Sequence, residues 1–167
     1  MNQLSKNKIL ILTIFVFIAA LIGVVTFTTQ NIYEPKKSTL KINDTLINVE
    51  LAETIEKQVK GLSGLEKIDP NYGMLFYFSD YKMRNFWMDG MLFPIDIIWI
   101  VNDKIIAIDK NIPIPTKEPL EIYPSPSPVN LVLEVAAGFT DKNNIKVGDK
   151  VEFNLLPNGA SIPIYRD

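Results

Sequence analysis

The chain has 167 residues and a formal net charge of -2 at neutral pH, and it contains neither histidine nor cysteine. This length suits one domain with an appendage. The charge gives no basic footprint, so we expect no nucleic-acid partner. Nucleophilic triads, the usual zinc and haem sites and a disulfide framework are excluded because their side chains are missing. We therefore expect no metal and no cofactor, and any catalysis must use Asp, Glu, Lys, Tyr, Ser or Thr.

A continuous apolar segment, residues 9–29, contains neither charge nor proline. An α-helix needs about 20 apolar residues to cross the hydrocarbon layer, so this segment predicts a single membrane-spanning helix. Lysines before it favour a cytoplasmic N-terminus and an extracytoplasmic remainder at the cell membrane. The alternative is a cleaved signal peptide, although such peptides have an apolar core of about 7–15 residues and small residues at the cleavage site. Cleavage would make the protein secreted rather than anchored.

The chain is predicted to divide into five parts. The polar, proline-containing stretch after the apolar segment is typical of a short tether. The predicted parts are a cytoplasmic N-terminus at 1–8, a transmembrane signal-anchor helix at 9–29, a linker at 30–39, a globular β-rich domain at 40–156 and a C-terminal tail at 157–167.

The first half of the globular part predicts a hairpin, a helix and two strands. Residues 39–52 alternate apolar and polar side chains around an Asn-Asp pair, which is typical of a β-hairpin. Residues 54–63 follow with helical spacing and one apolar face, and Thr54 is a suitable N-cap. A short apolar run at 74–78 predicts a buried strand. Residues 93–101 are apolar on both alternating faces, which indicates a central strand covered on both sides.

The second half predicts another hairpin, a long loop and further strands. An Asn-Asp pair links the central strand to a strand at 104–109. The stretch 113–128 holds six prolines, so it cannot be a regular ladder strand and is predicted to be a loop. Residues 129–135 alternate as a strand, 137–144 predict a helical turn, and 145–155 a final strand or hairpin. The sum is an α+β domain of mostly antiparallel β structure, a barrel-like or half-barrel sheet of six to eight strands with one or two short helices.

Five short motifs follow one another along this domain: "GLSGLEKI", "GMLFYF", "FWMDGMLFPIDIIWI", "VLEVAAG" and "IKVGDKV". In this order and spacing they resemble the family called domain of unknown function 192, over residues 50–154. The resemblance implies a compact, mostly antiparallel β domain that is exported or follows a membrane segment. The family has no established activity, so the resemblance implies candidate positions and no reaction.

The chain departs from the usual family pattern at two places. Many members have Met and Arg after Gly-Leu, where this chain has Ser63-Gly64-Leu65. The frequent Asn-Thr after Phe-Trp-Met is Asp89-Gly90 here. Any binding role of those Arg and Asn side chains does not carry over to this chain.

Asp96 stands out because it lies inside the apolar strand at 93–101. An unpaired carboxylate buried there would cost several kcal/mol of lost hydration. We therefore expect it to have partners: backbone N–H groups, Arg84, a lysine or a ligand. The structural alternative is that Asp96 caps or ties down a neighbouring loop.

Glu134 alternates outward from the apolar face of residues 129–135, so an exposed strand carboxylate is its plain alternative. Both Asp96 and Glu134 fall in the family motifs, and we expect them to face each other across a cleft near the loop at 113–128. Paired carboxylates can divide into acid and base, hold a hard cation, or accept hydrogen bonds from sugar hydroxyls or a peptide amine. All three possibilities remain open at this point.

Aromatic and methionine side chains supply candidate walls for such a cleft. Phe86, Trp87 and Met88 are adjacent and follow a polar loop, although side chains of this kind are usually core. Trp87 and Trp99 are candidates to stack on a sugar ring, and Tyr123 in the proline-rich loop is a candidate to close over it.

Three functions from different classes follow. The first is a membrane-anchored extracytoplasmic domain that binds a small polar or glycan-like ligand in a cleft. The second is a carboxylate-dependent glycan hydrolase, and the third is a protein-interaction or assembly module. A separation of about 5–5.5 Å or 6.5–9.5 Å between the two carboxyl groups would favour the hydrolase. The pattern leaves the oligomeric state and the question of enzyme activity open.

Overall fold

The computed structural model describes residues 38–154, which form nine strands and two short helices. The strands are β1 (Ser38–Ile42), β2 (Thr45–Ala52), β3 (Tyr72–Lys82), β4 (Asn85–Phe86), β5 (Ile95–Val101), β6 (Lys104–Ile112), β7 (Tyr123–Pro124), β8 (Val129–Ala136) and β9 (Val151–Asn154). The helices are α2 (Ile55–Lys60) and α3 (Phe139–Lys142).

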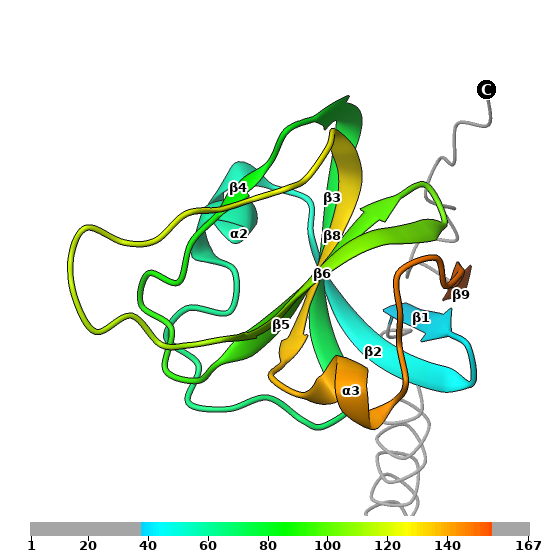
Figure 1. Ribbon diagram of the computed structural model, residues 1–167, viewed down its shortest axis with the longest axis horizontal. Helices are drawn as coiled ribbons and strands as arrows, with labels where there is room; N and C mark the ends of the chain where they lie inside the picture. Colours follow the sequence, from blue (N-terminus) through cyan, green and yellow to red (C-terminus); the bar gives the residue numbers. More distant parts are fainter. Residues whose placement is uncertain (1–37, 155–167) are drawn as a thin grey trace, which may run out of the picture. The chain divides into compact units, whose positions relative to one another are not determined.

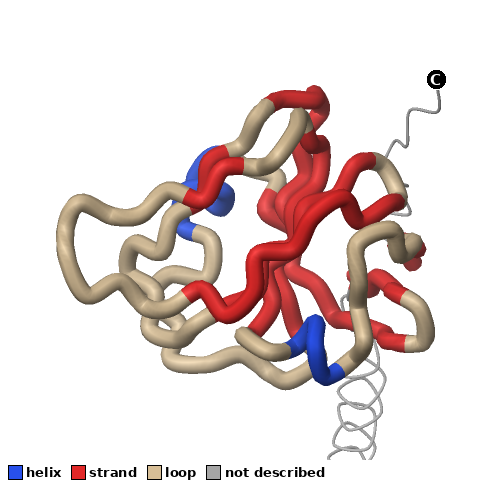
Figure 2. The backbone as a smooth tube through the Cα atoms, in the orientation of Figure 1, coloured by secondary structure: helices blue, strands red, loops and turns tan. Residues whose placement is uncertain are grey.

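Seven of these strands form one curled sheet in the order β6-β5-β8-β3-β2-β1-β9, and β4 pairs with β7 separately. All neighbours are antiparallel except β2 and β3. The first strand in the order, β6, also meets the segment before β9. There the Gly148 N–H donates to the backbone oxygen of Ile105 at 2.8 Å, and the Ile105 N–H donates to that of Asp149 at 3.0 Å. The sheet therefore curls into a half-barrel, as Figures 1 and 2 show.

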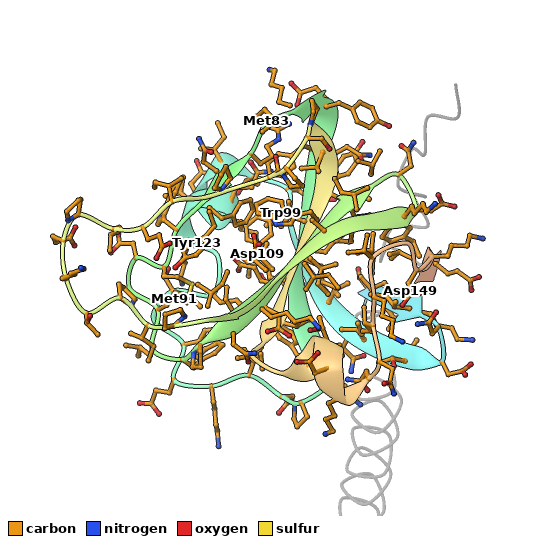
Figure 3. All side chains as sticks on the ribbon, viewed as in Figure 1. Met83, Met91, Trp99, Asp109, Tyr123 and Asp149 are labelled. Atoms are coloured by element: carbon orange, nitrogen blue, oxygen red, sulfur yellow. The ribbon has the colours of Figure 1, made fainter. Side chains whose placement is uncertain are left out.

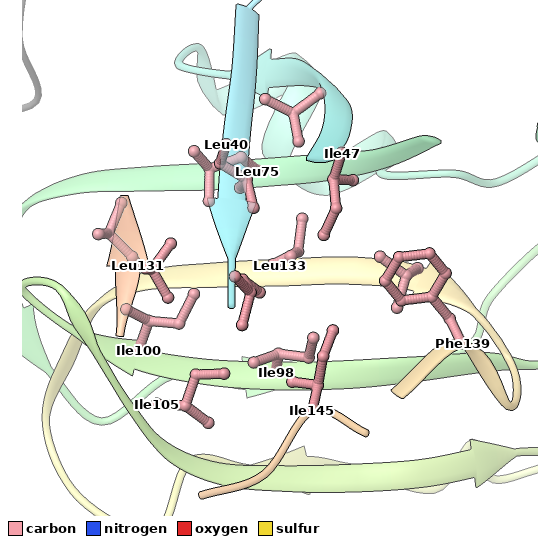
Figure 4. Close-up of a cluster of buried hydrophobic side chains, with 14 residues drawn as sticks. Leu40, Ile47, Leu75, Ile98, Ile100, Ile105, Leu131, Leu133, Phe139 and Ile145 are labelled. Atoms are coloured by element: carbon pink, nitrogen blue, oxygen red, sulfur yellow. The ribbon is translucent and has the colours of Figure 1, made fainter. Parts of the chain in front are cut away.

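The inside of the curl holds one hydrophobic cluster, drawn in Figure 4. Each of the seven strands of the curled sheet contributes a buried side chain, from Leu40 of β1 to Val151 of β9. Strands at opposite ends of the order can meet in one cluster only on the concave side. Phe139 of α3 closes one end of this cluster.

The other face of the sheet is also covered, by loops rather than by a second sheet. Buried side chains of this second cluster come from the sheet, such as Phe76, Ile97 and Trp99, and from the covering segments, such as Leu62 and Met91. Figure 1 shows α2, β4 and the long loop before β7 on this side of the molecule. Both faces of the central strands are therefore buried, which is why β5 and β8 are apolar on both alternating sides.

Most predicted elements are confirmed. The two hairpins turn at Asn43 and Asn102, whose φ angles of 54° and 56° lie in the left-handed region that asparagine tolerates. The mostly antiparallel half-barrel with two short helices is as expected. Nine strands are present in residues 38–154 instead of six to eight, because the proline-rich loop contributes β7 to a two-residue pair with β4.

The predicted helix at 54–63 is shorter than expected, and the prediction that it has one apolar face to bury is wrong. Thr54 is the N-cap as predicted, with its hydroxyl accepting from the Lys57 N–H at 3.3 Å. The helix ends at Lys60. Ile55 and Val59 are exposed, at 76% and 59%, and only Leu62 beyond the helix is buried.

The predicted membrane-spanning segment, residues 9–29, and the predicted tail lie outside the described residues. Within residues 38–154 no helix is both long and apolar enough to cross a membrane.

Candidate functional site

A cavity of about 300 Å³ lies on the loop-covered face of the sheet. Its walls come from the C-terminal part of α2 and the turn after it, from β3, and from the segment 83–91. Figure 3 labels two of the lining residues, Met83 and Met91. Apolar side chains make most of the wall, and its charged lining residues are Lys60, Arg84 and Glu134.

Glu134 reaches the cavity from the middle of the sheet. It belongs to β8, where it pairs with Met74 of β3 on one side and Ile97 of β5 on the other. The side chain is only 4% exposed. The alternative interpretation of Glu134, an exposed strand carboxylate, is therefore wrong, because the covering loops bury the face that would otherwise meet solvent.

The turn after α2 lies directly over the Glu134 carboxyl group. Gly61 ends the helix with φ of 50°, and a Cβ added there would lie 3.4 Å from Glu134 Oε2. The backbone N–H of Leu62, the next residue, acts on the same carboxyl group and slightly lowers its pKa. Glu134 Oε2 has no hydrogen-bond partner within the described part of the chain.

Burial dominates the titration of Glu134. Loss of hydration raises the pKa of its carboxyl from the ordinary value of 4.5 to about 8, against a smaller lowering by the Leu62 hydrogen bond. The group is therefore mostly protonated at neutral pH. A protonated carboxyl has one O–H donor.

Arg84 lines the same cavity and is held by three contacts. Its Nη2 donates to the backbone oxygen of Asp80 at 3.0 Å and to the carboxylate of that residue. Its guanidinium carbon lies 3.8 Å from the centroid of the Phe78 ring, a cation–π contact. Lys82 also pairs with Asp80, and the hydrogen bonds from Lys82 and Arg84 lower the pKa of the Asp80 carboxyl.

Two polar atoms of the cavity wall lack partners. Within the described part of the chain, Arg84 Nε and Glu134 Oε2 are the buried side-chain nitrogen and oxygen atoms without a hydrogen bond. Buried polar groups are normally satisfied, since each unmade bond costs about 1–3 kcal/mol. Because both atoms belong to lining residues of one cavity, a ligand there could satisfy both.

Aromatic rings form a rigid part of the cavity wall. Phe86 packs edge-on against Phe76, with ring centroids 4.8 Å apart, and against Trp99 at 5.4 Å. Trp87, the next residue, is 39% exposed and also lines the cavity. The candidates Arg84, Phe86, Trp87 and Glu134 therefore come together at one site.

Asp96 does not belong to this site. It pairs with Val135, one residue along from Glu134, so the two carboxyl groups point to opposite faces of the sheet. The expectation that Asp96 and Glu134 share a cleft is therefore wrong. The physical reason is the two-residue period of a strand, which places adjacent register positions on opposite sides.

The Asp96 carboxylate is fully occupied inside the fold. Its Oδ1 accepts from the backbone N–H of Asn111 at 2.8 Å and of Gly138 at 3.2 Å. Its Oδ2 accepts from the Thr140 N–H at 3.0 Å and from the Thr140 hydroxyl at 2.7 Å. This side chain ties α3 and the end of β6 to the central strand, which is the structural alternative stated for it.

Three other candidates lie away from the Glu134 cavity. Trp99 is fully buried and donates from Nε1 to Asp109 Oδ2 at 2.8 Å, so it has no free ring face on which a sugar could stack. Met88 and Tyr123 line a smaller hollow of about 130 Å³ under the proline-rich loop. Figure 3 shows Trp99 and Asp109 side by side and Tyr123 farther out.

Several lining residues were not predicted. Gln58 fixes α2 to the sheet by donating to the backbone oxygens of Ala52 and Tyr77, both at 3.1 Å. Phe78 ends the predicted apolar run, and Met83 lies in the polar loop that follows. A useful signal was present in Gly61, since a glycine just after a helix marks a turn that can approach a buried group closely.

Comparison with known proteins agrees with this architecture. The sequence pattern of domain of unknown function 192, described as an uncharacterized ACR, matches residues 38–153. The chain belongs to this family. No curated protein matched the chain.

Two solved structures are similar over most of the domain. One is a candidate transcription regulator from Sinorhizobium meliloti 1021, with 27% identity and a TM-score of 0.65 over 74% of this chain and 98% of that one. The other is a protein of unknown function from Novosphingobium aromaticivorans DSM 12444, with 31% identity and a TM-score of 0.62 over 68% of this chain and 83% of that one.

The two segments in which this chain departs from the family pattern touch each other at the edge of the cavity. The Ser63 hydroxyl donates to the backbone oxygen of Asp89 at 2.5 Å, and the Gly64 N–H donates to that of Gly90 at 2.9 Å. A Cβ at Gly90 would lie 3.3 Å from that of Ser63. The turn after α2 and the segment Asp89-Gly90 are therefore in direct contact.

Proposed function

We propose that this member of the family is a binding domain that takes a small ligand with a polar group and an apolar face into the Glu134 cavity. The observation that carries the proposal is a pair of unsatisfied buried atoms, Arg84 Nε and Glu134 Oε2, which belong to two residues that line one cavity. A ligand that bonds to both would remove the energetic cost of leaving these buried atoms unpaired.

The rest of the wall supports the same ligand class. Phe76, Phe86 and Met91 offer a buried apolar surface, and Trp87 offers a half-exposed ring at the same cavity. Pockets that bind small molecules combine apolar walls with a few placed polar groups. A sugar ring, with one apolar face and several hydroxyl groups, is among the ligands that match this combination.

Binding is favoured over glycan hydrolysis by the positions of the carboxyl groups. Glycosidases use two carboxyl groups that flank one scissile bond. Asp96 lies on the other face of the sheet with both oxygens occupied, so Glu134 lacks this partner. Within residues 38–154 no cluster of three acidic side chains offers a metal-binding site instead.

The proposal can be tested with the full-length protein and a fragment library, by ligand-observed NMR followed by tryptophan fluorescence. The chain has two tryptophans, of which Trp87 lines the cavity and Trp99 is fully buried. A ligand in the cavity should change the emission of Trp87, and the change should vanish in Trp87→Phe. Glu134→Met should weaken binding at least about tenfold, the loss of one strong hydrogen bond.

Two matched controls keep this test specific. Glu66→Met changes an exposed carboxylate outside the cavity and should leave binding unaltered. Lys82→Gln and Arg84→Gln both remove an ion pair to Asp80, but only Arg84 lines the cavity, so only Arg84→Gln should weaken binding. Ligands whose affinity is unchanged by Glu134→Met and Arg84→Gln would defeat the proposal.

The cellular location belongs to the same proposal. We propose that residues 9–29 anchor the protein in the cell membrane with the binding domain outside, on the basis of their apolar length. The protein should then resist alkaline carbonate extraction, and external protease should remove the domain. Recovery of a soluble mature form that begins near residue 30 would show a cleaved signal peptide instead.

A further inference from the structure

The charges and free hydrogen-bonding groups of the Glu134 cavity restrict its ligand further. Resting on the proposed function, we infer that the ligand is a small monoanion, a carboxylate on an apolar body, whose oxygens accept hydrogen bonds from Glu134 and Arg84. This goes beyond a binding role by fixing the charge of the ligand and the direction of each hydrogen bond.

The first argument is the charge of the cavity wall. The charged residues that line it are two cations, Lys60 from α2 and Arg84 after β3, and one acid, Glu134 from β8. Asp80 offsets Arg84, but it lies outside the lining. Burial holds the pKa of Glu134 at about 8, so the one acid is mostly neutral at pH 7. The wall therefore carries positive charge and no full negative charge, which favours an anion.

The second argument is the direction of the free hydrogen bonds. An arginine nitrogen can only donate, so Arg84 Nε requires an acceptor. Burial keeps the Glu134 carboxyl mostly protonated, so it has an O–H to donate, and its Oε2 has no partner. Both unsatisfied groups are thus donors. A carboxylate offers two acceptor oxygens on one carbon atom. Hydrogen bonds between a carboxyl O–H and a carboxylate are short and strong.

The third argument is the size and character of the remaining space. A cavity of about 300 Å³ lies at the small end of the range of roughly 300–1,000 Å³ that small-molecule pockets span, so it suits a small ligand. Phe76, Phe78 and Phe86 line this space, which suits an apolar body more than a heavily hydrated ion such as inorganic phosphate. A carboxylate with one ring or a short branched chain has the right dimensions.

A cationic ligand fits the same wall poorly. It could bind only after Glu134 loses its proton in a fully buried site, against the burial that raises its pKa. It would also lie in a cavity lined by Lys60 and Arg84. An amine is therefore the sharpest competitor against which to test the inference.

The test uses three probes of nearly equal size that share one aromatic ring and differ in charge. Phenylacetate is an anion, phenylacetamide is neutral and phenethylamine is a cation at neutral pH. Their affinities for the full-length protein are measured at pH 7 by titration calorimetry and Trp87 fluorescence. We expect phenylacetate to bind at least about tenfold more tightly than phenethylamine, the difference that one charge-assisted hydrogen bond supplies.

Two substitutions at Glu134 show whether this residue binds the ligand as a hydrogen-bond donor or as an ionised acceptor. The amide of Glu134→Gln keeps the size of the side chain and can still donate to the ligand, so phenylacetate affinity should stay within about threefold of the wild type. Glu134→Met removes the donor and should weaken phenylacetate about tenfold. If Glu134 instead binds as an ionised acceptor, Glu134→Gln and Glu134→Met should both abolish binding of the amine.

The outcomes distinguish this inference from the proposed function. Tighter binding of the amide or the amine than of phenylacetate, still dependent on Glu134, would overturn the anion but leave a binding cavity. Binding of library fragments while phenylacetate fails to bind would overturn it in the same way. If no compound binds in a manner that depends on Trp87, Arg84 or Glu134, the proposed function itself fails.

Discussion

Asp96 and Glu134 are two buried carboxyl groups on neighbouring strands, and their surroundings differ completely. Asp96 accepts four hydrogen bonds, from three backbone N–H groups and one hydroxyl. Glu134 lines a cavity, and its buried Oε2 has no hydrogen-bond partner. A buried acid whose lone pairs are all used is part of the fold, whereas one with a free oxygen is available to a ligand. Three predictions test this contrast.

The largest effect is expected at Asp96. Asp96→Asn replaces one accepting oxygen with an amide NH₂, which would face either the Thr140 donors or the N–H groups of Asn111 and Gly138. The loss of two hydrogen bonds to a charged group should lower the free energy of unfolding by about 3 kcal/mol. Urea denaturation of the full-length protein measures the change.

Asp69→Asn, at an exposed position, serves as the control for that measurement and should be neutral within about 0.5 kcal/mol. A loss below about 1 kcal/mol for Asp96→Asn would contradict the structural role of Asp96.

The second effect concerns pH and belongs to Glu134. In the unfolded chain its carboxyl titrates near 4.3, whereas burial raises its folded-state pKa to about 8. Between these values the folded state keeps a proton that the unfolded state has lost, so stability falls as pH rises. Each pH unit in this window costs about 1.4 kcal/mol, so the wild type should lose about 2 kcal/mol between pH 6 and 7.5 relative to Glu134→Gln.

Denaturation of both proteins across this pH range isolates the contribution of Glu134, because all other titrating groups are shared. Parallel curves for wild type and Glu134→Gln would mean that Glu134 titrates normally and is not held neutral by burial.

The smallest effect tests one bond of the Asp96 network. Thr140→Val keeps the shape of the side chain and removes the hydroxyl that donates to Asp96 Oδ2 at 2.7 Å. Thr140 is fully buried, so the change should destabilise by about 1–1.5 kcal/mol while ligand binding at Glu134 stays unaltered. Thr116→Val, at an exposed loop position, should change neither quantity. Weakened ligand binding in Thr140→Val would show that the two faces of the sheet are coupled.

Local features of the fold were predictable because they depend on residues close together in the sequence. The two Asn-Asp pairs placed the hairpins, and Thr54 placed the start of α2. The six prolines of 113–128 predicted a loop, and the structure adds only the two-residue β7 there. The identity of Arg84, Phe86 and Trp87 as wall residues was also predictable, since they adjoin a polar loop beside an apolar strand.

The sequence by itself determined that Asp96 has partners, because a carboxylate in an apolar strand is too costly to bury alone. It did not determine the surroundings of Glu134. Period-two alternation in β8 says which side chains share a face, but not whether that face meets solvent. The turn after α2 and the segment around Met91 cover it, and they come from parts of the chain far from β8. Only the tertiary structure brings these segments together, and their packing turns an expected surface carboxylate into the buried, mostly protonated acid of a cavity.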